Sequence, residues 1–355
     1  MKITPASPPD ATRAGDVENS WILPEQKIMF VSIGKNACTS IKWLLAEISG
    51  QDVGRILSAD SLQSTQRMLI HRRQSWRDTP KLTQVDDATR AAISPGNGWF
   101  VFAVVRDPRL RAFSAWQSKF LVGDPSYSGR KYVGRDWLPR TPETARDVLE
   151  DWEKFVGALE RGRDRGGIST GDGHFAPHTA RLSEAVVPYS RIYDMSEIGQ
   201  LTGDLAAHLV ATVGSSPELT LARENDTPLK AGREVFAGGL LERLETIYAS
   251  DFERFGDLWA ASSATTMERP VGWTPDALRD IAARRAINEH VAALDAKLTA
   301  RGRRIKELNR RNAELQERLD ALTQRPQPVP PRPEPAWYAR AVRGGKRAAR
   351  RAITR

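Results

Sequence analysis

The sequence predicts an α/β protein: a P-loop-like parallel sheet flanked by helices, followed by a C-terminal coiled-coil helix. Two short apolar runs, at 27–33 and 99–105, are typical of strands buried on both faces of a sheet. A helix pattern follows each run, and the repeated order of strand, tight loop and helix is typical of βαβ units. A regular heptad pattern near the C-terminus predicts the coiled coil.

The chain divides into five predicted segments. Residues 1–20 are polar and contain Pro, so we expect a flexible arm. Residues 21–258 carry the strand and helix patterns and form the predicted globular domain. A polar linker at 259–276 leads to the coiled coil at 277–324, and a Pro-rich and basic tail occupies 325–355.

Within the globular domain, each of the first two strands leads into an amphipathic helix. Ile41, Leu44, Leu45 and Ile48 follow the first strand at helical spacing. A third strand is expected at 189–193, followed by a helix from about 198 to 213. A long helix is then expected from about 233 to 255.

The heptads of the C-terminal helix favour a parallel homodimer. Nine of its eleven a and d positions are apolar, and Arg301 and Asn312 are the exceptions. An Asn at an a position is satisfied by its counterpart in a parallel, in-register pair. The a positions are Val291, Leu298, Ile305, Asn312 and Leu319, and the d positions are Ile287, Leu294, Arg301, Leu308, Leu315 and Leu322.

Composition and charge restrict the protein class. Cys38 is the single cysteine, so no intrachain disulfide forms and Cys-based zinc sites are excluded. The N-terminal residues show no apolar signal segment, and no run of 18 apolar residues occurs. We therefore expect a cytoplasmic protein. Of the net charge of +9, residues 337–355 contribute seven basic residues and no acid, so the basicity belongs to the tail.

The segment FVSIGKNACTSIKW, residues 30–43, joins the first strand to a helix. The unpaired N–H groups of a first helical turn favour an anion there, and Lys35 with the Thr39 and Ser40 hydroxyls would add a charge and two donors. The alternative is a helix capped by Thr39 or Ser40, with Lys35 in solvent.

The segment VRDPRLRAFS, residues 105–114, joins the second strand to its helix. Arg106 at the strand end and Ser114 in the helix can converge on one phosphate, Arg106 through its bidentate guanidinium. In the alternative, Asp107 caps the helix, Pro108 takes its first position, and the arginines are solvated. The two interpretations are compatible, because capping does not occupy Arg106.

These two segments, about 70 residues apart, resemble the donor-binding signature of the sulfotransferases that use PAPS (3′-phosphoadenosine 5′-phosphosulfate), in particular the carbohydrate (Golgi-type and bacterial) branch. The resemblance covers about 25–257 and implies transfer of a sulfuryl group to a hydroxyl, without a metal. Gly34 departs from the family, which usually has Pro before the Lys. By position, the resemblance assigns the 5′-phosphosulfate to Lys35, Asn36, Ala37, Cys38, Thr39 and Ser40, and the 3′-phosphate to Arg106 and Ser114.

A sulfuryl transfer needs charge stabilisation on the leaving phosphate, which suits Lys35, and a base for the acceptor hydroxyl. The segment GDGHFAPHTARL resembles the family's His-containing acceptor-side segment, and His174 is the first candidate for the base. His178, His71 or a carboxylate stay open as alternatives. Catalysis by the Cys38 thiol is disfavoured, because no His–Asp pair can be placed beside it from the sequence.

Two other function classes stay open. A nucleotide-dependent kinase could use the 34–40 loop, although the strict G-x-x-x-x-G-K-[ST] pattern is absent. A coiled-coil interaction protein with a vestigial nucleotide site is the other alternative. The acceptor of a sulfotransferase would meet loops such as 122–146 and 161–178.

The expected partners are a carbohydrate or glycolipid acceptor and a second copy of the chain through 277–324. The tail residues 337–355 could also contact an anionic membrane, with Trp337 and Tyr338 at its interface. That contact would place the protein at the inner membrane surface. Nucleic acid or solvent alone are the alternatives for the tail.

Overall fold

In the computed structural model, the described chain forms two units that divide at Asp295. Of the expected arm at 1–20, only residues 17, 19 and 20 are described. The tail at 325–355 is described only at 336–338 and 340–343, which are helical. The described residues are 17, 19–58, 63, 65–127, 132–222, 224, 227–323, 336–338 and 340–343.

Among the described residues, four strands form one sheet in the order β1–β2–β3–β4. The last three are parallel, as predicted, whereas β1 pairs antiparallel with β2 at one edge. The prediction of a parallel sheet was therefore wrong for β1, which the sequence analysis did not identify as a strand. The strands are β1 (Ser20–Leu23), β2 (Ile28–Val31), β3 (Phe100–Val105) and β4 (Arg191–Asp194).

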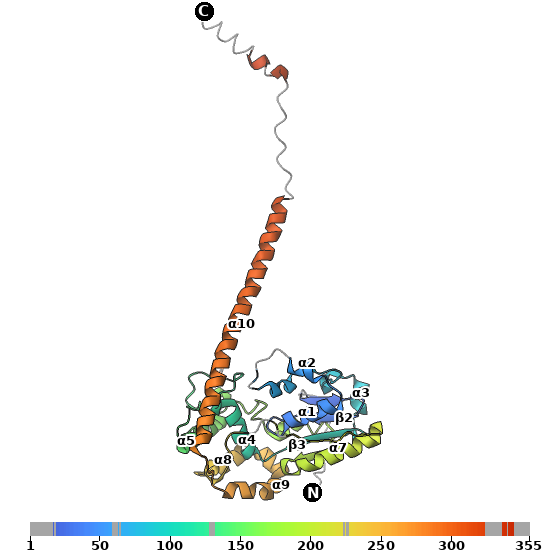
Figure 1. Ribbon diagram of the computed structural model, residues 1–355, viewed down its shortest axis with the longest axis vertical. Helices are drawn as coiled ribbons and strands as arrows, with labels where there is room; N and C mark the ends of the chain where they lie inside the picture. The colour runs from blue at the N-terminus through green and yellow to red at the C-terminus, as the bar shows by residue number, and fades with distance from the viewer. Residues whose placement is uncertain are drawn as a thin grey trace, which may run out of the picture. The chain divides into compact units, whose positions relative to one another are not determined.

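Helices cover both faces of this sheet (Figure 1). The face that carries Phe30 and Phe102 packs against α1 and α7, and the face that carries Val31 packs against Trp259 of α9. The helices are α1 (Cys38–Ile48), α2 (Val53–Leu57), α3 (Asp87–Ala92), α4 (Pro108–Trp116), α5 (Ala145–Arg161), α6 (His178–Leu182), α7 (Ile198–Val213), α8 (Leu240–Ile247), α9 (Ala249–Glu268) and α10 (Pro275–Thr323).

The helix after β3 changes its geometry midway. It continues from α4 as a π-helical segment, Gln117–Leu121. Gln117 is buried and pairs its amide with the backbone N–H and C=O of Leu229. A buried side-chain amide is tolerated when both its donor and its acceptor are satisfied. An aromatic cluster that includes Trp116, Trp152 and Phe155 covers this region.

The helix predicted over 198–213 is confirmed as α7. The single helix predicted over 233–255 is confirmed only in part: a short 3₁₀ turn, Arg233–Phe236, precedes a break at Gly238 and Gly239, and the helical structure that follows is divided at Tyr248 into α8 and α9. Both glycines have positive φ, 66° and 80°, which ends the turn before α8 begins.

The segment predicted as a linker, 259–276, is largely part of the folded unit. Helix α9 continues to Glu268, and Trp259 is buried and donates from Nε1 to Asp194 Oδ1 over 3.1 Å. Trp273 donates to the carbonyl oxygen of Lys230 over 2.8 Å. The linker prediction for 259–276 was therefore wrong, because this polar segment contains residues that pack against the domain.

Helix α10 begins in the first unit, where Leu278 and Ile281 are buried. The boundary between the units lies at Asp295, inside the segment predicted as coiled coil. Beyond it, Leu298, Ile305 and Leu315 have exposed fractions of 64%, 58% and 60%. The predicted helix is thus confirmed as far as Thr323, with the apolar side chains beyond Asp295 exposed, while pairing into a coiled coil stays a prediction. No described helix is long and apolar enough to cross a membrane.

Candidate functional site

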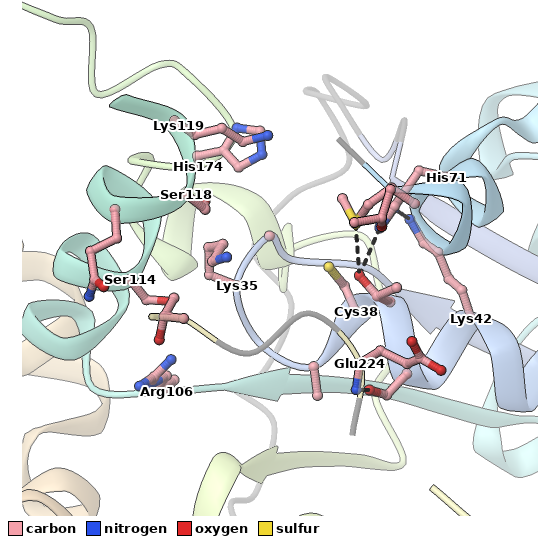
Figure 2. A pocket seen from close by; sticks show the side chains of 18 of the residues that line it. Lys35, Cys38, Lys42, His71, Arg106, Ser114, Ser118, Lys119, His174 and Glu224 are labelled. Carbon is pink, nitrogen blue, oxygen red and sulfur yellow. Dashed lines mark hydrogen bonds between the residues drawn. The ribbon is translucent and has the colours of Figure 1, made fainter. Parts of the chain in front are cut away.

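A cavity of about 1340 Å³ opens where the parallel strands end. Ser32 and Lys35 follow β2, Arg106 follows β3, and Met195 follows β4, and all four line it. The carboxyl ends of parallel strands are where open α/β sheets bind their ligands. The two segments singled out in the sequence therefore meet in one cavity (Figure 2).

The loop before α1 has an unusual backbone. Lys35 and Ala37 both have positive φ, 70° and 53°, which costs a residue with a Cβ about 1–2 kcal/mol. Ala37 is the N-cap of α1 and supplies no side-chain hydrogen bond, so no cap competes for the N–H groups of the first turn. Thr39 and Ser40 lie inside the helix and do not cap it. Such a loop is suited to an anion at the start of α1.

Lys35 lines the cavity with no hydrogen bond or ion pair to any described residue. Burial lowers the pKa of its ammonium group to about 8, and the positive charges of Lys119 and Arg106 act in the same direction, against the opposing effect of Cys38. A bound anion would reverse this shift, because an opposite charge favours the protonated lysine. The electrostatic environment of Lys35 thus fits a negatively charged ligand.

Arg106 and Ser114 line the same cavity as Lys35 (Figure 2). Asp107 caps α4 by accepting a hydrogen bond from Arg109 N over 2.8 Å, and Pro108 takes the first position of the helix. The guanidinium of Arg109 is bound to Asp107, at 2.6 Å, and to Glu245. The capping interpretation is therefore correct for Asp107 and leaves Arg106 at the cavity wall.

Asn36 does not line the cavity. Its side-chain Nδ2 donates to the carbonyl oxygen of Val104 over 2.8 Å, and the residue is buried. The Asn36 side chain therefore fastens the loop to β3 and is not directed into the cavity, and the assignment of this residue to the donor stays a prediction. The reason is packing: the loop turns this side chain toward the sheet.

His174 lies at the cavity wall in a hydrogen-bonded group with Asp172 and Tyr127. Its Nδ1 is 3.1 Å from Asp172 Oδ1 and 2.8 Å from the Tyr127 hydroxyl. That hydroxyl donates to the carboxylate of Asp172, whose two oxygens both lie 2.9 Å away. Among the described residues, Nε2 has no hydrogen-bond partner. Burial lowers the pKa of His174, although Asp172 opposes this shift, and the lowered pKa favours the neutral ring.

Asp172 is held ionised. Burial acts to raise its pKa, but the hydrogen bonds from His174 and Tyr127 outweigh that effect and bring it to about 2. A carboxylate at Nδ1 fixes the histidine tautomer with its proton on Nδ1. The lone pair of Nε2 is then available for a proton from a ligand hydroxyl.

His71 also lines the cavity, but both of its ring nitrogens are engaged. Nε2 is 3.0 Å from the Thr39 hydroxyl and Nδ1 is 2.9 Å from Lys42 Nζ. Burial and the charge of Lys42 place the pKa of His71 well below its ordinary value. Such a histidine positions Thr39 and Lys42 and is a weak base.

His178 is not at the cavity. It is fully buried at the start of α6, and its Nδ1 lies 2.7 Å from Asp251 Oδ2. His178 therefore has a structural role, and the alternative that made it the base is wrong. Cys38 does line the cavity, but His71 and His174 bind other partners, so no histidine activates its thiol.

Four residues at or beside the site were not predicted from the sequence: Arg111, Lys119, Asp172 and Tyr127. Arg111 belongs to the segment VRDPRLRAFS, and Asp172 stands two residues before His174, so both had a signal in the sequence. Lys119 lies in the π-helical segment, where Nζ is 2.7 Å from Asp124 Oδ2 and 5.0 Å from the ring centre of Tyr127. A π-helical segment is frequent at functional sites and has no simple sequence pattern.

A sequence model of the sulfotransferase family matches residues 18–256. No curated protein and no solved structure matches the chain. Gly34, where the resembled signature has Pro, lies close to the candidate base, since a Cβ at that position would be 3.4 Å from Cδ2 of His174. The matched residues include the loop after β2, Arg106, Ser114 and His174, and the chain belongs to the sulfotransferase family.

Proposed function

We propose that the protein transfers a sulfuryl group from PAPS to a hydroxyl of a carbohydrate or glycolipid. The observation that carries this proposal is the meeting of three groups in one cavity: the loop that begins α1, the Arg106–Ser114 pair, and His174. The first two supply cationic and N–H donors for phosphates, and the third supplies a base.

The donor would be held at two places. The N–H groups at the start of α1, with Lys35 and the hydroxyls of Thr39 and Ser40, suit the 5′-phosphosulfate. Ala37 and Cys38 contribute backbone at the same turn. Arg106 and Ser114 suit the 3′-phosphate, because a guanidinium binds phosphate through two parallel hydrogen bonds.

PAPS supplies the activated sulfuryl group. His174 Nε2 accepts the proton of the acceptor hydroxyl, and the carboxylate of Asp172 stabilises the charge that the ring acquires. Lys35 stabilises negative charge on the departing phosphate. The acceptor oxygen gains the sulfuryl group, and the desulfated nucleotide PAP (3′-phosphoadenosine 5′-phosphate) leaves.

The acceptor would enter beside the loops expected for it. Val122, Asp124 and Tyr127 from the first loop and Gly173 and His174 from the second line the cavity. Polar and aromatic side chains together suit a sugar, which offers hydroxyls and apolar ring faces. Screening transfer of ³⁵S from labelled PAPS to extracted glycans and lipids would identify the acceptor.

Calorimetry with PAP, PAPS and Mg-ATP tests the proposal against its rivals. We expect tight binding of PAP that does not require Mg²⁺. Preference for Mg-ATP would indicate the kinase alternative, and a folded protein that binds none of these would indicate the interaction protein. Arg106→Ala should weaken PAP binding by about 2–4 kcal/mol, because a charge-assisted contact is lost. Arg146→Ala, at an exposed arginine of α5, is the matched control and should bind PAP normally.

A further inference from the structure

Arg181 on α6 lines the cavity without a partner of its own. No described residue accepts a hydrogen bond from its guanidinium or forms an ion pair with it, and its Nε is buried without an acceptor. A buried N–H group without an acceptor costs free energy, so such groups are rare unless a ligand satisfies them. The unpaired guanidinium therefore points to a ligand that carries acceptor oxygens.

The guanidinium lies beside the residue that precedes the candidate base in the chain. A Cβ built on Gly173, the residue before His174, would be 3.9 Å from Nη2 of Arg181. The neighbouring Arg111 is already committed, since it donates to the carbonyl oxygens of Gly173 and Ala176. Of these two arginines beside Gly173, Arg181 is therefore the one whose guanidinium can bind a group of the acceptor.

Most other cations of the cavity have a partner or another role. Lys119 binds Asp124 at 2.7 Å, Arg284 binds Asp280 at 2.7 Å, and Lys42 contacts His71. Lys35 and Arg106 belong to the proposed donor site. Arg181 differs from these cations, because no carboxylate of the described residues lies within hydrogen-bond distance of its guanidinium.

Helix α6 is held at both ends in a way that fixes the position of Arg181. The N–H groups of His178 and Thr179 donate to the two carboxylate oxygens of Asp251 over 2.8 and 2.9 Å. At the other end, the Tyr189 hydroxyl donates to the carbonyl oxygen of Leu182 over 2.6 Å. A five-residue helix is unstable alone, so these contacts hold it in place. A side chain on such a support is preorganised for binding.

We propose that Arg181 binds an acidic group of the acceptor, a carboxylate or a phosphate, next to the hydroxyl that His174 deprotonates. The inference rests on the proposed function, and it narrows the acceptor to an acidic carbohydrate. A carboxylate or phosphate accepts two parallel hydrogen bonds from a guanidinium, which fixes the orientation of the sugar as well as adding affinity.

A printed glycan array, probed with the full-length protein saturated with PAP, tests this inference. The array carries glycans with uronate carboxylates, glycans with sugar phosphates, and the same glycans after carboxyl reduction or dephosphorylation. We expect the wild-type protein to bind acidic members at least tenfold more tightly than their neutral counterparts. Arg181→Gln should lose this preference, and Arg181→Lys should keep part of it. Binding to carboxylates alone or to phosphates alone identifies which group is bound.

Arg254→Gln is the matched control, because Arg254 binds Glu184 near α6 and does not line the cavity. It should keep the wild-type preference. An equal response to acidic and neutral glycans by wild type, or an undiminished preference in Arg181→Gln, overturns the inference. So does a tenfold loss of PAP affinity in Arg181→Gln, which would place Arg181 in the donor site.

Calorimetry with PAP on each variant separates this inference from the proposed function. If PAP binds and acidic glycans are not preferred, the acidic subsite is wrong and the donor site stands. If wild type fails to bind PAP, the proposed function fails first. Normal PAP binding by Arg181→Gln also shows that this variant is folded.

Discussion

The guanidinium of Arg111 joins the two loops of the site: its Nε donates to the carbonyl oxygen of Gly34 over 3.0 Å. Its other nitrogens donate to Ala176 and Gly173, at 2.7 and 3.3 Å, on either side of His174. Arg111 is buried, so these bonds are shielded from water. One side chain of α4 thus sets the distance between the donor loop and the candidate base.

The first prediction follows from this contact. Arg111→Lys keeps the charge but cannot reach three carbonyl oxygens, so it leaves buried acceptors unpaired. We expect the free energy of unfolding to fall by about 2–4 kcal/mol and kcat to fall as well, because both loops lose their common support. Urea denaturation and steady-state kinetics measure these effects.

Arg109→Lys is the control for that prediction. Arg109 lies on the same helix but binds Asp107 and Glu245, away from both loops. It should cost stability without changing kcat. Equal kcat losses in the two variants would show that the loop contact has no special role.

The second prediction concerns the base. His174→Ala should lower kcat by roughly 10² or more and leave PAP affinity nearly unchanged, because the ring would act only on the acceptor hydroxyl. Asp172→Asn should lower kcat by about tenfold, since it removes the carboxylate that orients the ring. Single-turnover sulfuryl transfer and PAP calorimetry measure the two effects. Wild-type turnover in His174→Ala with a loss in His71→Ala would reassign the base.

The third prediction is a bell-shaped pH dependence of kcat/KM. The base must be neutral, and burial places the pKa of His174 below its ordinary value, so activity rises with pH on the acid side. Lys35 must be charged and has a pKa of about 8 in the free protein, so activity falls as pH rises through that value. Asp172→Asn should move the acid limb to lower pH, because Asp172 raises the pKa of His174. An unmoved acid limb would count against the pairing.

The fourth prediction is a parallel dimer through α10. The exposed apolar stripe beyond Asp295 is unfavourable in water and would be buried against a second helix. Analytical ultracentrifugation should show a dimer, and Leu308→Glu with Leu315→Glu should give a folded monomer. Glu307→Gln, outside the stripe, serves as the control. A wild-type monomer at micromolar concentration would contradict the prediction.

The fifth prediction concerns the tail, 325–355. We propose that its basic residues bind anionic membranes, each contributing about 1 kcal/mol near acidic lipid. Sedimentation with anionic vesicles should be salt-sensitive, absent with neutral vesicles, and lost on deletion of 325–355, while transfer to a soluble acceptor persists. If the shortened protein sediments equally, the tail is not the anchor. If instead the tail binds RNA and no vesicles, its basic residues bind nucleic acid and the membrane proposal is wrong.

Sequence patterns alone determined the parts of the protein that depend on local order. Apolar runs predicted β2 and β3, helical spacing predicted α1, and two strand-to-helix segments indicated Lys35, Arg106 and Ser114. These features are readable because strand burial, helix periodicity and the anion preference of a helix N-terminus each act over a few neighbouring residues.

Tertiary structure alone decided what depends on contacts between distant segments. Burial beside Asp251 removed His178 from the candidates for the base, and burial, opposed by Asp172, lowered the pKa of His174. Helix α9 includes most of the segment 259–276, whose composition had indicated a linker. Solvation and hydrogen-bond partners, and hence the pKa of each histidine, depend on which segments pack together, and no local pattern specifies that.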